Sequence, residues 1–295
     1  MRIRIIDAFT ARPFAGNPAG VCLLDSVAWP AESWMQQVAA EMHLPETAFA
    51  RPLADTAEAD WGLRWFTPVI EANLCGHATL ATAHALHADR GGPGTVRFAS
   101  RSGVLVAHTG ADGQITLDFP AAPLTEAPTP DGLAEVLGVK PDAAYATGAL
   151  GDLLSVLPDE AAVRAVDPDF AALARLTRRD GIRGVIVTAA PSTPDSGYDF
   201  VSRYFAPAGG VPEDPVTGSA HTALAPYWSS RLGRDSLTGL QASARTGLVG
   251  TTVRGDRVHL AGTAVTVLDG TLQAAAVRDD HQAHPDPVDM AAERN

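Results

Sequence analysis

The sequence predicts an α+β protein of two pseudo-symmetric domains, each a barrel-like sheet wrapped around one central α-helix. Two observations predict this fold class. Residues 63–86 and 202–228 repeat one pattern, and each repeat ends in a run of small, mostly apolar residues with helical character. A helix that is apolar nearly all round has no face to show water and belongs in the interior of a fold. Two such helices, each flanked by strands, indicate two related domains in one chain.

The internal repeat is clearest where each copy begins. The first copy reads RWFTP at 64–68, and the second reads RYFAP at 203–207. Each copy then crosses a loop with acidic residues and reaches a glycine, Gly76 or Gly218, that opens the small-residue helix. The spacing from the phenylalanine to this glycine is 10 residues in the first copy and 13 in the second. Loops tolerate insertions of this size.

The segments before these repeats agree in their order of strands and helices. The expected elements are strands at 3–10, 20–24 and 46–52 with a helix at 30–42 in the first half, and strands at 153–158 and 184–191 with a helix within 167–181 in the second. Each half therefore follows the order strand, helix, strand, strand and glycine-started helix.

The domain boundaries follow from this repeat. We expect an N-terminal lobe at 1–121 and a C-terminal lobe at 122–278, joined within the proline-rich segment 119–132. The last strand is expected either to complete the second lobe or to return to the first. Residues 279–295 form a polar tail.

Composition narrows the class of function. The chain has 295 residues, 46% of them hydrophobic, and a net charge of −12, which disfavours nucleic acid and anionic membranes as partners. No secretory signal or 18-residue apolar run is present, and the two cysteines do not suggest a disulfide framework. These features predict a cytoplasmic protein. The only lysine, Lys140, lies in a turn-like context, which disfavours a Schiff-base cofactor.

The two glycine-started helices could bind an anion. A helix N-terminus exposes unpaired N–H groups and carries partial positive charge, and a glycine lets the backbone approach a ligand closely. Gly76 and Gly218, facing each other across a cleft, would suit a carboxylate or a developing enolate. His77 and Ser219 follow these glycines at equivalent positions. The alternatives are a glycine that only eases a tight turn, and a histidine or serine that only caps the helix.

Cys75 precedes the first helix and admits several interpretations. A thiol at a helix N-terminus has a lowered pKa and could react. A two-thiol racemase needs a second cysteine at the equivalent place, but Thr217 stands there, and Cys22 is expected in the core. Cys75, His84 and His87 could be metal ligands, but no second cysteine or HExxH pattern supports them, so no metal is expected. We therefore expect Cys75 to line the ligand site.

Two carboxylates are candidates for proton transfer or substrate binding. Glu46 directly precedes an apolar strand, and a carboxylate at the mouth of a dry cleft has a raised pKa suited to acid/base work. Its alternative is an exposed turn residue after Pro45. Asp214 lies four residues before Gly218 and could bind a substrate amine or hydroxyl, or cap the approach to the helix.

Four segments together resemble the phenazine-biosynthesis PhzF-like family of the diaminopimelate epimerase-like superfamily. They are DAFTARPFAGNPAG (7–20), LPETAFA (44–50), FTPVIEANLCGHAT (66–79) and FAPAGGVPEDPVTGSAH (205–221), and they occur in the family's order. The resemblance extends to about residue 275. It implies the two-lobed fold with the active site between the lobes, and a cofactor-free isomerase that moves a proton on a small carboxylate substrate. It also implies a homodimer.

The resemblance assigns roles residue by residue. The family's acid/base glutamate falls on Glu46, and the Gly-His of its first helix start falls on Gly76 and His77. Its Asp, Gly and Ser of the second motif fall on Asp214, Gly218 and Ser219. The expected catalytic residues are thus Glu46, His77 and Asp214, and the expected substrate-binding residues are Gly76, Gly218, Ser219 and Cys75. The chain departs from the founding phenazine enzymes at Cys75, where they carry alanine.

Three functions remain open from the sequence. The first is the Glu46-dependent isomerase. The second is an amino-acid racemase or epimerase that uses Cys75, and the third is a non-catalytic protein that binds a small ligand on the same scaffold. The intact set of Glu46, His77 and Asp214 favours the first.

Overall fold

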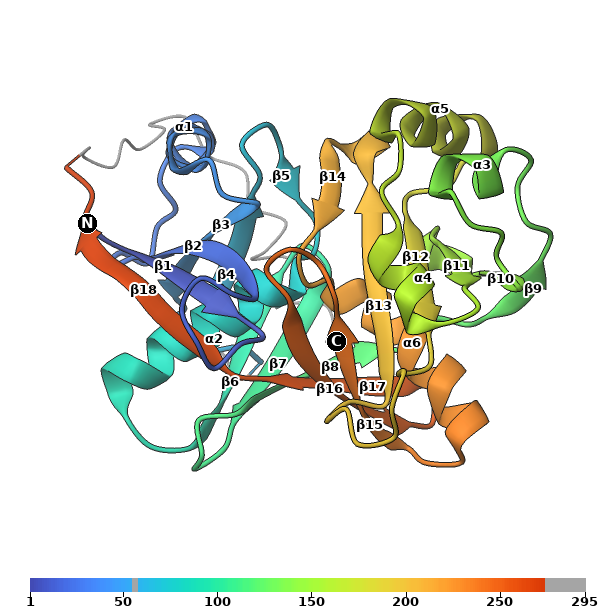
Figure 1. The fold of residues 1–295 in the computed structure, drawn as a ribbon. Helices are drawn as coiled ribbons and strands as arrows, with labels where there is room; N and C mark the ends of the chain where they lie inside the picture. The colour runs from blue at the N-terminus through green and yellow to red at the C-terminus, as the bar shows by residue number, and fades with distance from the viewer. Residues whose placement is uncertain (55–57, 274–295) are drawn as a thin grey trace. The chain divides into compact units, whose positions relative to one another are not determined.

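The computed structural model describes residues 1–54 and 58–273, and it is a mixed α/β protein with six α-helices in that part of the chain (Figure 1). The chain forms two compact units, Met1–Asp118 with the segment from Ala261 onward, and Phe119–Leu260. The polar tail expected at 279–295 lies outside the described residues. None of the described helices combines the length and apolar character needed to span a bilayer.

Unit 1 contains two helices and strands from both ends of the described chain. Its elements are β1 (Arg2–Ala8), β2 (Asn17–Leu23), α1 (Glu32–Met42), β3 (Glu46–Pro52), β4 (Trp61–Phe66), β5 (Glu71–Ala72), α2 (Gly76–Arg90), β6 (Gly94–Ser100), β7 (Gly103–Thr109), most of β8 (Ile115–Pro120), and β18 (Ala264–Thr271). The strand β18 pairs with β1 at the other end of the chain, with Thr271 opposite Arg2.

Unit 2 holds the other four helices. Its elements are β9 (Thr125–Ala127), α3 (Leu133–Leu137), β10 (Ala143–Ala146), the 3-10 turn η1 (Gly148–Leu150), β11 (Leu153–Val156), α4 (Glu160–Ala165), α5 (Phe170–Asp180), β12 (Val185–Ala189), β13 (Phe200–Ala206), the 3-10 turn η2 (Pro207–Gly209), β14 (Val211–Asp214), α6 (Gly218–Leu232), β15 (Ser236–Gln241), β16 (Gly247–Arg254) and most of β17 (Arg257–Gly262).

The two units repeat one pattern of strand pairing. In unit 1, β1–β2 is antiparallel, β2–β3 parallel, β3–β4 antiparallel, β4–β6 parallel and β6–β7 antiparallel. In unit 2, β10–β11, β11–β12, β12–β13, β13–β15 and β15–β16 follow the same sequence of directions. The short turn η2 lies in the loop where the second copy is three residues longer. The repeat in the sequence is therefore a repeat of topology.

The arginine of each repeat makes the same contacts. Arg64 Nε donates to Glu71 at 2.7 Å, and Arg203 Nε donates to Glu213 at 2.7 Å. Each guanidinium also lies over the phenylalanine two residues further on, at 5.3 Å and 4.9 Å from the ring centroid. These ion pairs join β4 to β5 and β13 to β14, the segments that lead into α2 and α6.

The first two strands differ from their expected bounds at the loop between them. The strand β1 ends at Ala8 because Phe9 adopts a φ of 61°, which breaks the extended backbone. The strand β2 begins at Asn17, directly after Gly16, which has a φ of 64°. A Cβ at Gly16 would lie 2.1 Å from the Ala8 carbonyl oxygen, so only glycine fits.

Helix α2 is buried over most of its surface, as its small residues predict. It packs along β1, β2, β3, β7 and β18 of unit 1. Helix α1 covers a different part of the same unit, where Trp34, Met35 and Val38 join a cluster that includes Phe49 and Phe66. Cys22 belongs to that cluster, and its burial raises the thiol pKa to about 12, so it is an unreactive core residue.

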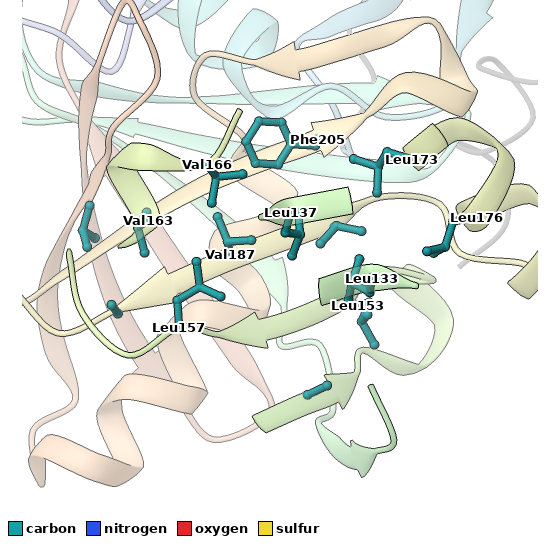
Figure 2. Packing of buried hydrophobic residues seen from close by; sticks show 14 residues of the cluster. Leu133, Leu137, Leu153, Leu157, Val163, Val166, Leu173, Leu176, Val187 and Phe205 are labelled. Atoms are coloured by element: carbon teal, nitrogen blue, oxygen red, sulfur yellow. The ribbon is translucent and has the colours of Figure 1, made fainter. Parts of the chain in front are cut away.

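Neighbouring side chains along the strands of unit 2 belong to two hydrophobic clusters, each packed against different helices. Leu154, Ile186 and Phe200 pack with residues of α6, whereas their neighbours Leu153 and Val187 pack with α3, α4 and α5. Figure 2 shows this second cluster, in which Phe205 lies near Val166 and Leu173. The side-chain period of two along each strand explains how one sheet serves two hydrophobic layers.

Two buried residues close the first turn of the central helices in the same way. Thr79 Oγ1 donates to the Cys75 carbonyl at 2.6 Å in α2. His221 Nδ1 donates to the Thr217 carbonyl at 2.8 Å in α6. Within the described chain His221 Nε2 has no hydrogen-bond partner. Burial lowers the pKa of His221 to about 4 because a second N–H on the ring could not be satisfied.

Replacement of His221 by threonine is expected to weaken the pH dependence of stability. Threonine is chosen because Thr79 occupies the equivalent position in α2. His221 binds a proton more readily in the unfolded chain, at an ordinary pKa of about 6.5, than in the folded one. Stability therefore falls as pH drops from about 6.5 towards 4. Between pH 7 and pH 5 the wild type should lose about 2 kcal/mol more than His221→Thr. Urea unfolding at both pH values measures this difference, and equal losses would contradict it.

Candidate functional site

Three element starts meet in unit 1 at one edge of its sheet. Asn17 opens β2, Glu46 opens β3, and Cys75 is the N-cap of α2. The strands β2 and β3 are parallel and place Ala19 opposite Glu46, so both strands begin at the same edge. Parallel strands with matched starts bring polar residues together there, although the residues are far apart in sequence.

Glu46, Cys75 and His77 form a compact cluster at this edge, with one ligand-type atom from each lying within 4.8 Å of the others. His77 Nε2 lies 3.3 Å from Glu46 Oε2. Cys75 Sγ lies 3.5 Å from His77 Nδ1 and 3.9 Å from Nε2. The Glu46 side chain is 19% exposed and that of His77 only 6%. Glu46 is therefore the member that solvent and small molecules reach most readily.

The His77 ring is neutral and oriented. Asn17 Nδ2 donates to Nδ1 at 3.1 Å, so Nε2 carries the proton, and Nε2 lies 3.3 Å from Glu46 Oε2. Burial lowers the His77 pKa to about 3, so the ring does not titrate near pH 7. A histidine at this position could either donate a hydrogen bond or shuttle a proton. A neutral ring whose Nε2 lies 3.3 Å from a carboxylate oxygen favours the donor.

The N-terminus of α2 opens beside this cluster. Cys75 has an extended backbone and makes no side-chain capping hydrogen bond to the helix. Gly76 is partly exposed and follows at once. The first-turn N–H groups of α2 therefore lack a cap from the side chain that usually provides one, which leaves partial positive charge beside Glu46.

In unit 2 the loop that leads into α6 is held by Gln241. Gln241 Nε2 donates to the Asp214 carbonyl at 2.6 Å, and Gln241 Oε1 accepts from the Thr217 N–H at 2.7 Å. Thr217 Oγ1 donates to Asp214 Oδ2 at 2.5 Å. The Asp214 carboxylate is thus fixed just before Gly218, the first residue of α6.

Ser219 lies in the first turn of α6 and contacts an arginine. Arg183 Nη2 donates to Ser219 Oγ at 3.1 Å. The same guanidinium makes a two-pronged ion pair with Asp152, whose side chain is fully buried. Tyr204 also donates to Asp152 at 3.1 Å. This network places a half-exposed cation beside the start of α6.

The structure therefore divides the predicted site residues between the two units. Glu46, Cys75, Gly76 and His77 lie together in unit 1, and Asp214, Gly218 and Ser219 lie together in unit 2. His84 and His87 do not join the Glu46 cluster. His84 instead hydrogen-bonds Thr266 at 3.1 Å. Cys22 is in the core, as expected.

Three residues of these sites were not singled out from the sequence. Asn17 lies within the first motif, AGNPAG, and that was its only signal. Gln241 and Arg183 lie outside all four motifs. Their positions follow from strand pairing, which places β15 beside β13 and β12 beside β11. No local sequence pattern indicates this pairing.

Comparisons with known proteins give matches over most of the chain. A family model described as phenazine biosynthesis-like protein matches residues 6–270. The chain is 49% identical to an uncharacterized isomerase of Pseudomonas aeruginosa over 91% of this chain and 97% of that protein. It is 41% identical to the human phenazine biosynthesis-like domain-containing protein, over 92% of this chain and 99% of that protein.

Solved structures show the same likeness. A phenazine biosynthesis protein of the PhzF family from Enterococcus faecalis superposes with a TM-score of 0.82, at 41% identity over 91% of this chain and 97% of that chain. A hydroxyproline epimerase from Agrobacterium vitis superposes with a TM-score of 0.59 at 14% identity, over 100% of this chain and 98% of that chain. The second likeness concerns the fold alone.

Proposed function

Because the chain belongs to the phenazine biosynthesis-like family, we propose that it is a cofactor-independent isomerase that moves a proton on a small carboxylate substrate. The single observation that carries the proposal is the pairing of Glu46 with His77 at 3.3 Å, beside the start of α2. A partly buried carboxylate next to a neutral donor and a helix N-terminus combines a base with a site for negative charge.

In this proposal Glu46 is the general acid/base. The ionised carboxylate takes a proton from a carbon next to an unsaturated or carboxyl group and returns it to another carbon of the same molecule. His77 Nε2–H fixes the orientation of the Glu46 carboxylate, and Asn17 fixes the ring. The N–H groups near Gly76 stabilise the negative charge that develops on the substrate.

The second unit contributes predictions of its own. Asp214, Gly218 and Ser219 remain predicted to bind polar groups of the substrate, and a homodimer remains predicted for the assembly. We also propose that each unit is a barrel-like sheet around its axial helix. The packing of α2 along five strands and of α6 against residues of β11, β12 and β13 supports this part.

A second candidate is an amino-acid racemase or epimerase that uses Cys75. One observation favours it, since Cys75 Sγ lies 3.5 Å from His77 Nδ1 and within the Glu46 cluster. A thiol beside a helix N-terminus can ionise and take a proton from carbon. The position equivalent to Cys75 holds Thr217, so this enzyme would use one thiol and not the pair of a two-thiol racemase.

Solvent-deuterium exchange tests both candidates and the passive binder. The protein is incubated in D₂O with small aromatic and amino-acid-derived carboxylates, and incorporation is followed by mass spectrometry and NMR. The proposal expects deuterium at carbon in at least one of them and continued exchange in Cys75→Ala. Loss of exchange in Cys75→Ala, with exchange kept in Glu46→Gln, would favour the thiol enzyme. Binding with no exchange in any of the compounds would favour a passive binder.

A further inference from the structure

We propose that Glu46, Cys75 and His77 form a binding site for a thiophilic divalent cation such as Zn²⁺, and that the bound ion stops proton transfer. The second half of this inference rests on the proposed function, because it needs Glu46 to be the base. The first half concerns only the geometry and chemistry of three side chains.

The distances within the cluster suit a tetrahedral ion. Zn²⁺ bonds of about 2.0–2.1 Å to nitrogen, 2.0–2.2 Å to oxygen and 2.3 Å to sulfur place tetrahedral ligands about 3.3 Å apart for N and O and about 3.5 Å apart for N and S. His77 Nε2 and Glu46 Oε2 are 3.3 Å apart, and Cys75 Sγ and His77 Nε2 are 3.9 Å apart. The Sγ–Nε2 distance would need to shorten by about 0.4 Å, and the ligand atoms of Cys75 and Glu46 already lie within 4.8 Å of each other.

The surroundings of His77 can supply the tautomer that a metal needs. A metal-bound Nε2 is unprotonated, so Nδ1 then carries the hydrogen and needs an acceptor. Asn17 already contacts Nδ1 through its amide nitrogen at 3.1 Å. Turning this amide over presents its oxygen to the same atom. Asn17 could therefore accept from Nδ1–H and hold the tautomer of His77 that binds a metal.

Charge and burial also favour the ion. Cys75 is 6% exposed, and the His77 side chain is equally buried. A thiolate and a carboxylate supply two negative charges, which one divalent cation balances in a site largely removed from water. The partly exposed side of Glu46 leaves a fourth position for water, as in open zinc sites.

The ligand types set the selectivity. Sulfur and imidazole ligands favour Zn²⁺ and Co²⁺, whereas Mg²⁺ and Ca²⁺ prefer all-oxygen sites. An ion bound to the Glu46 oxygen occupies the lone pairs that accept the substrate proton. Micromolar zinc would therefore act as a reversible inhibitor of the isomerase.

Titration with Co²⁺ tests the site directly. Tag-free, metal-free full-length protein should bind one Co²⁺ per chain with a thiolate-to-cobalt absorption band, which Zn²⁺ displaces and Mg²⁺ does not. Cys75→Ala should lose the band, and it should bind Co²⁺ at least about tenfold more weakly in calorimetry. The matched controls are Cys22→Ala, at a core cysteine, and His87→Asn, at a histidine of the same helix outside the cluster. Both should keep the band.

Three results would overturn the inference: no stoichiometric Co²⁺ binding by the wild type, equal affinity in Cys75→Ala, or loss of the band in His87→Asn. Deuterium exchange is also measured with Zn²⁺ present, where Zn²⁺ should stop exchange and EDTA should restore it. Metal binding by the wild type together with full exchange in Glu46→Gln would contradict the proposed function and keep the metal site. Loss of exchange in Glu46→Gln together with no metal binding by the wild type would contradict the metal site and keep the function.

Discussion

Replacement of Glu46 by glutamine is expected to lower the rate of proton exchange by about 10²–10⁴-fold, the usual effect of losing a positioned acid/base. Glutamine keeps the size of the side chain and can still accept the hydrogen bond from His77 Nε2. It cannot take a proton from carbon at neutral pH. The fold and the substrate contacts near Gly76 should therefore survive. Exchange rates in D₂O, measured with the substrate that the wild type labels, check this expectation.

The control for this variant is the same chemical change at an exposed glutamate. Glu41 lies in the last turn of α1 and is exposed, so Glu41→Gln should exchange at the wild-type rate. Calorimetry with the substrate should show that Glu46→Gln still binds it. Full exchange in Glu46→Gln would remove Glu46 from the mechanism and leave Cys75 as the base to test.

The sequence predicted the family and the main repeat for identifiable reasons. Four motifs in order identified the PhzF-like family, which is confirmed by the match over residues 6–270. The expectation of an isomerase agrees with the name of the Pseudomonas aeruginosa relative. The small residues of α2 and α6 predicted burial, and both helices are buried over most of their length. Local composition was enough here because the apolar pattern covers the whole helix.

The neighbours of Glu46 could not be predicted from local pattern. Helical spacing grouped Cys75 with His84 and His87, but the structure groups it with His77 and Glu46. Glu46 reaches the cluster because β2 and β3 are parallel and begin at one edge. Asn17 reaches it because a glycine at 16 turns the chain into β2. Strand register between distant segments creates this site, and one sequence does not display that register.

The strands after each central helix were also beyond sequence reasoning. No strand was expected in 94–120, yet β6 and β7 form an antiparallel pair there. In β7 the buried residues Ala107 and Thr109 are flanked by partly or fully exposed ones, so the apolar alternation is weak. The strand β18 has only partly or fully exposed residues and is held in place by pairing with β1. Such strands are defined by partners rather than by their own hydrophobic pattern.

Replacement of Phe205 by alanine is expected to destabilise the protein by about 3–5 kcal/mol, the range for removing a large buried aromatic side chain. Phe205 is fully buried in the cluster that joins β12 and β13 to α3, α4 and α5. Its ring also lies under the Arg203 guanidinium, at 4.9 Å. Removing the ring leaves a cavity and uncovers an arginine that holds Glu213 in the segment before α6. Urea unfolding at pH 7 measures the loss.

The comparison variant is Phe14→Ala, because Phe14 is 76% exposed and the same ring atoms are removed. Surface changes of this kind alter stability by less than about 0.5 kcal/mol. A loss in Phe205→Ala no larger than in Phe14→Ala would contradict the packing in Figure 2. Phe205→Leu should fill most of the cavity and recover part of the stability, because leucine is apolar but smaller than phenylalanine. The loss that remains combines the missing volume with the missing contact between the ring and the Arg203 guanidinium.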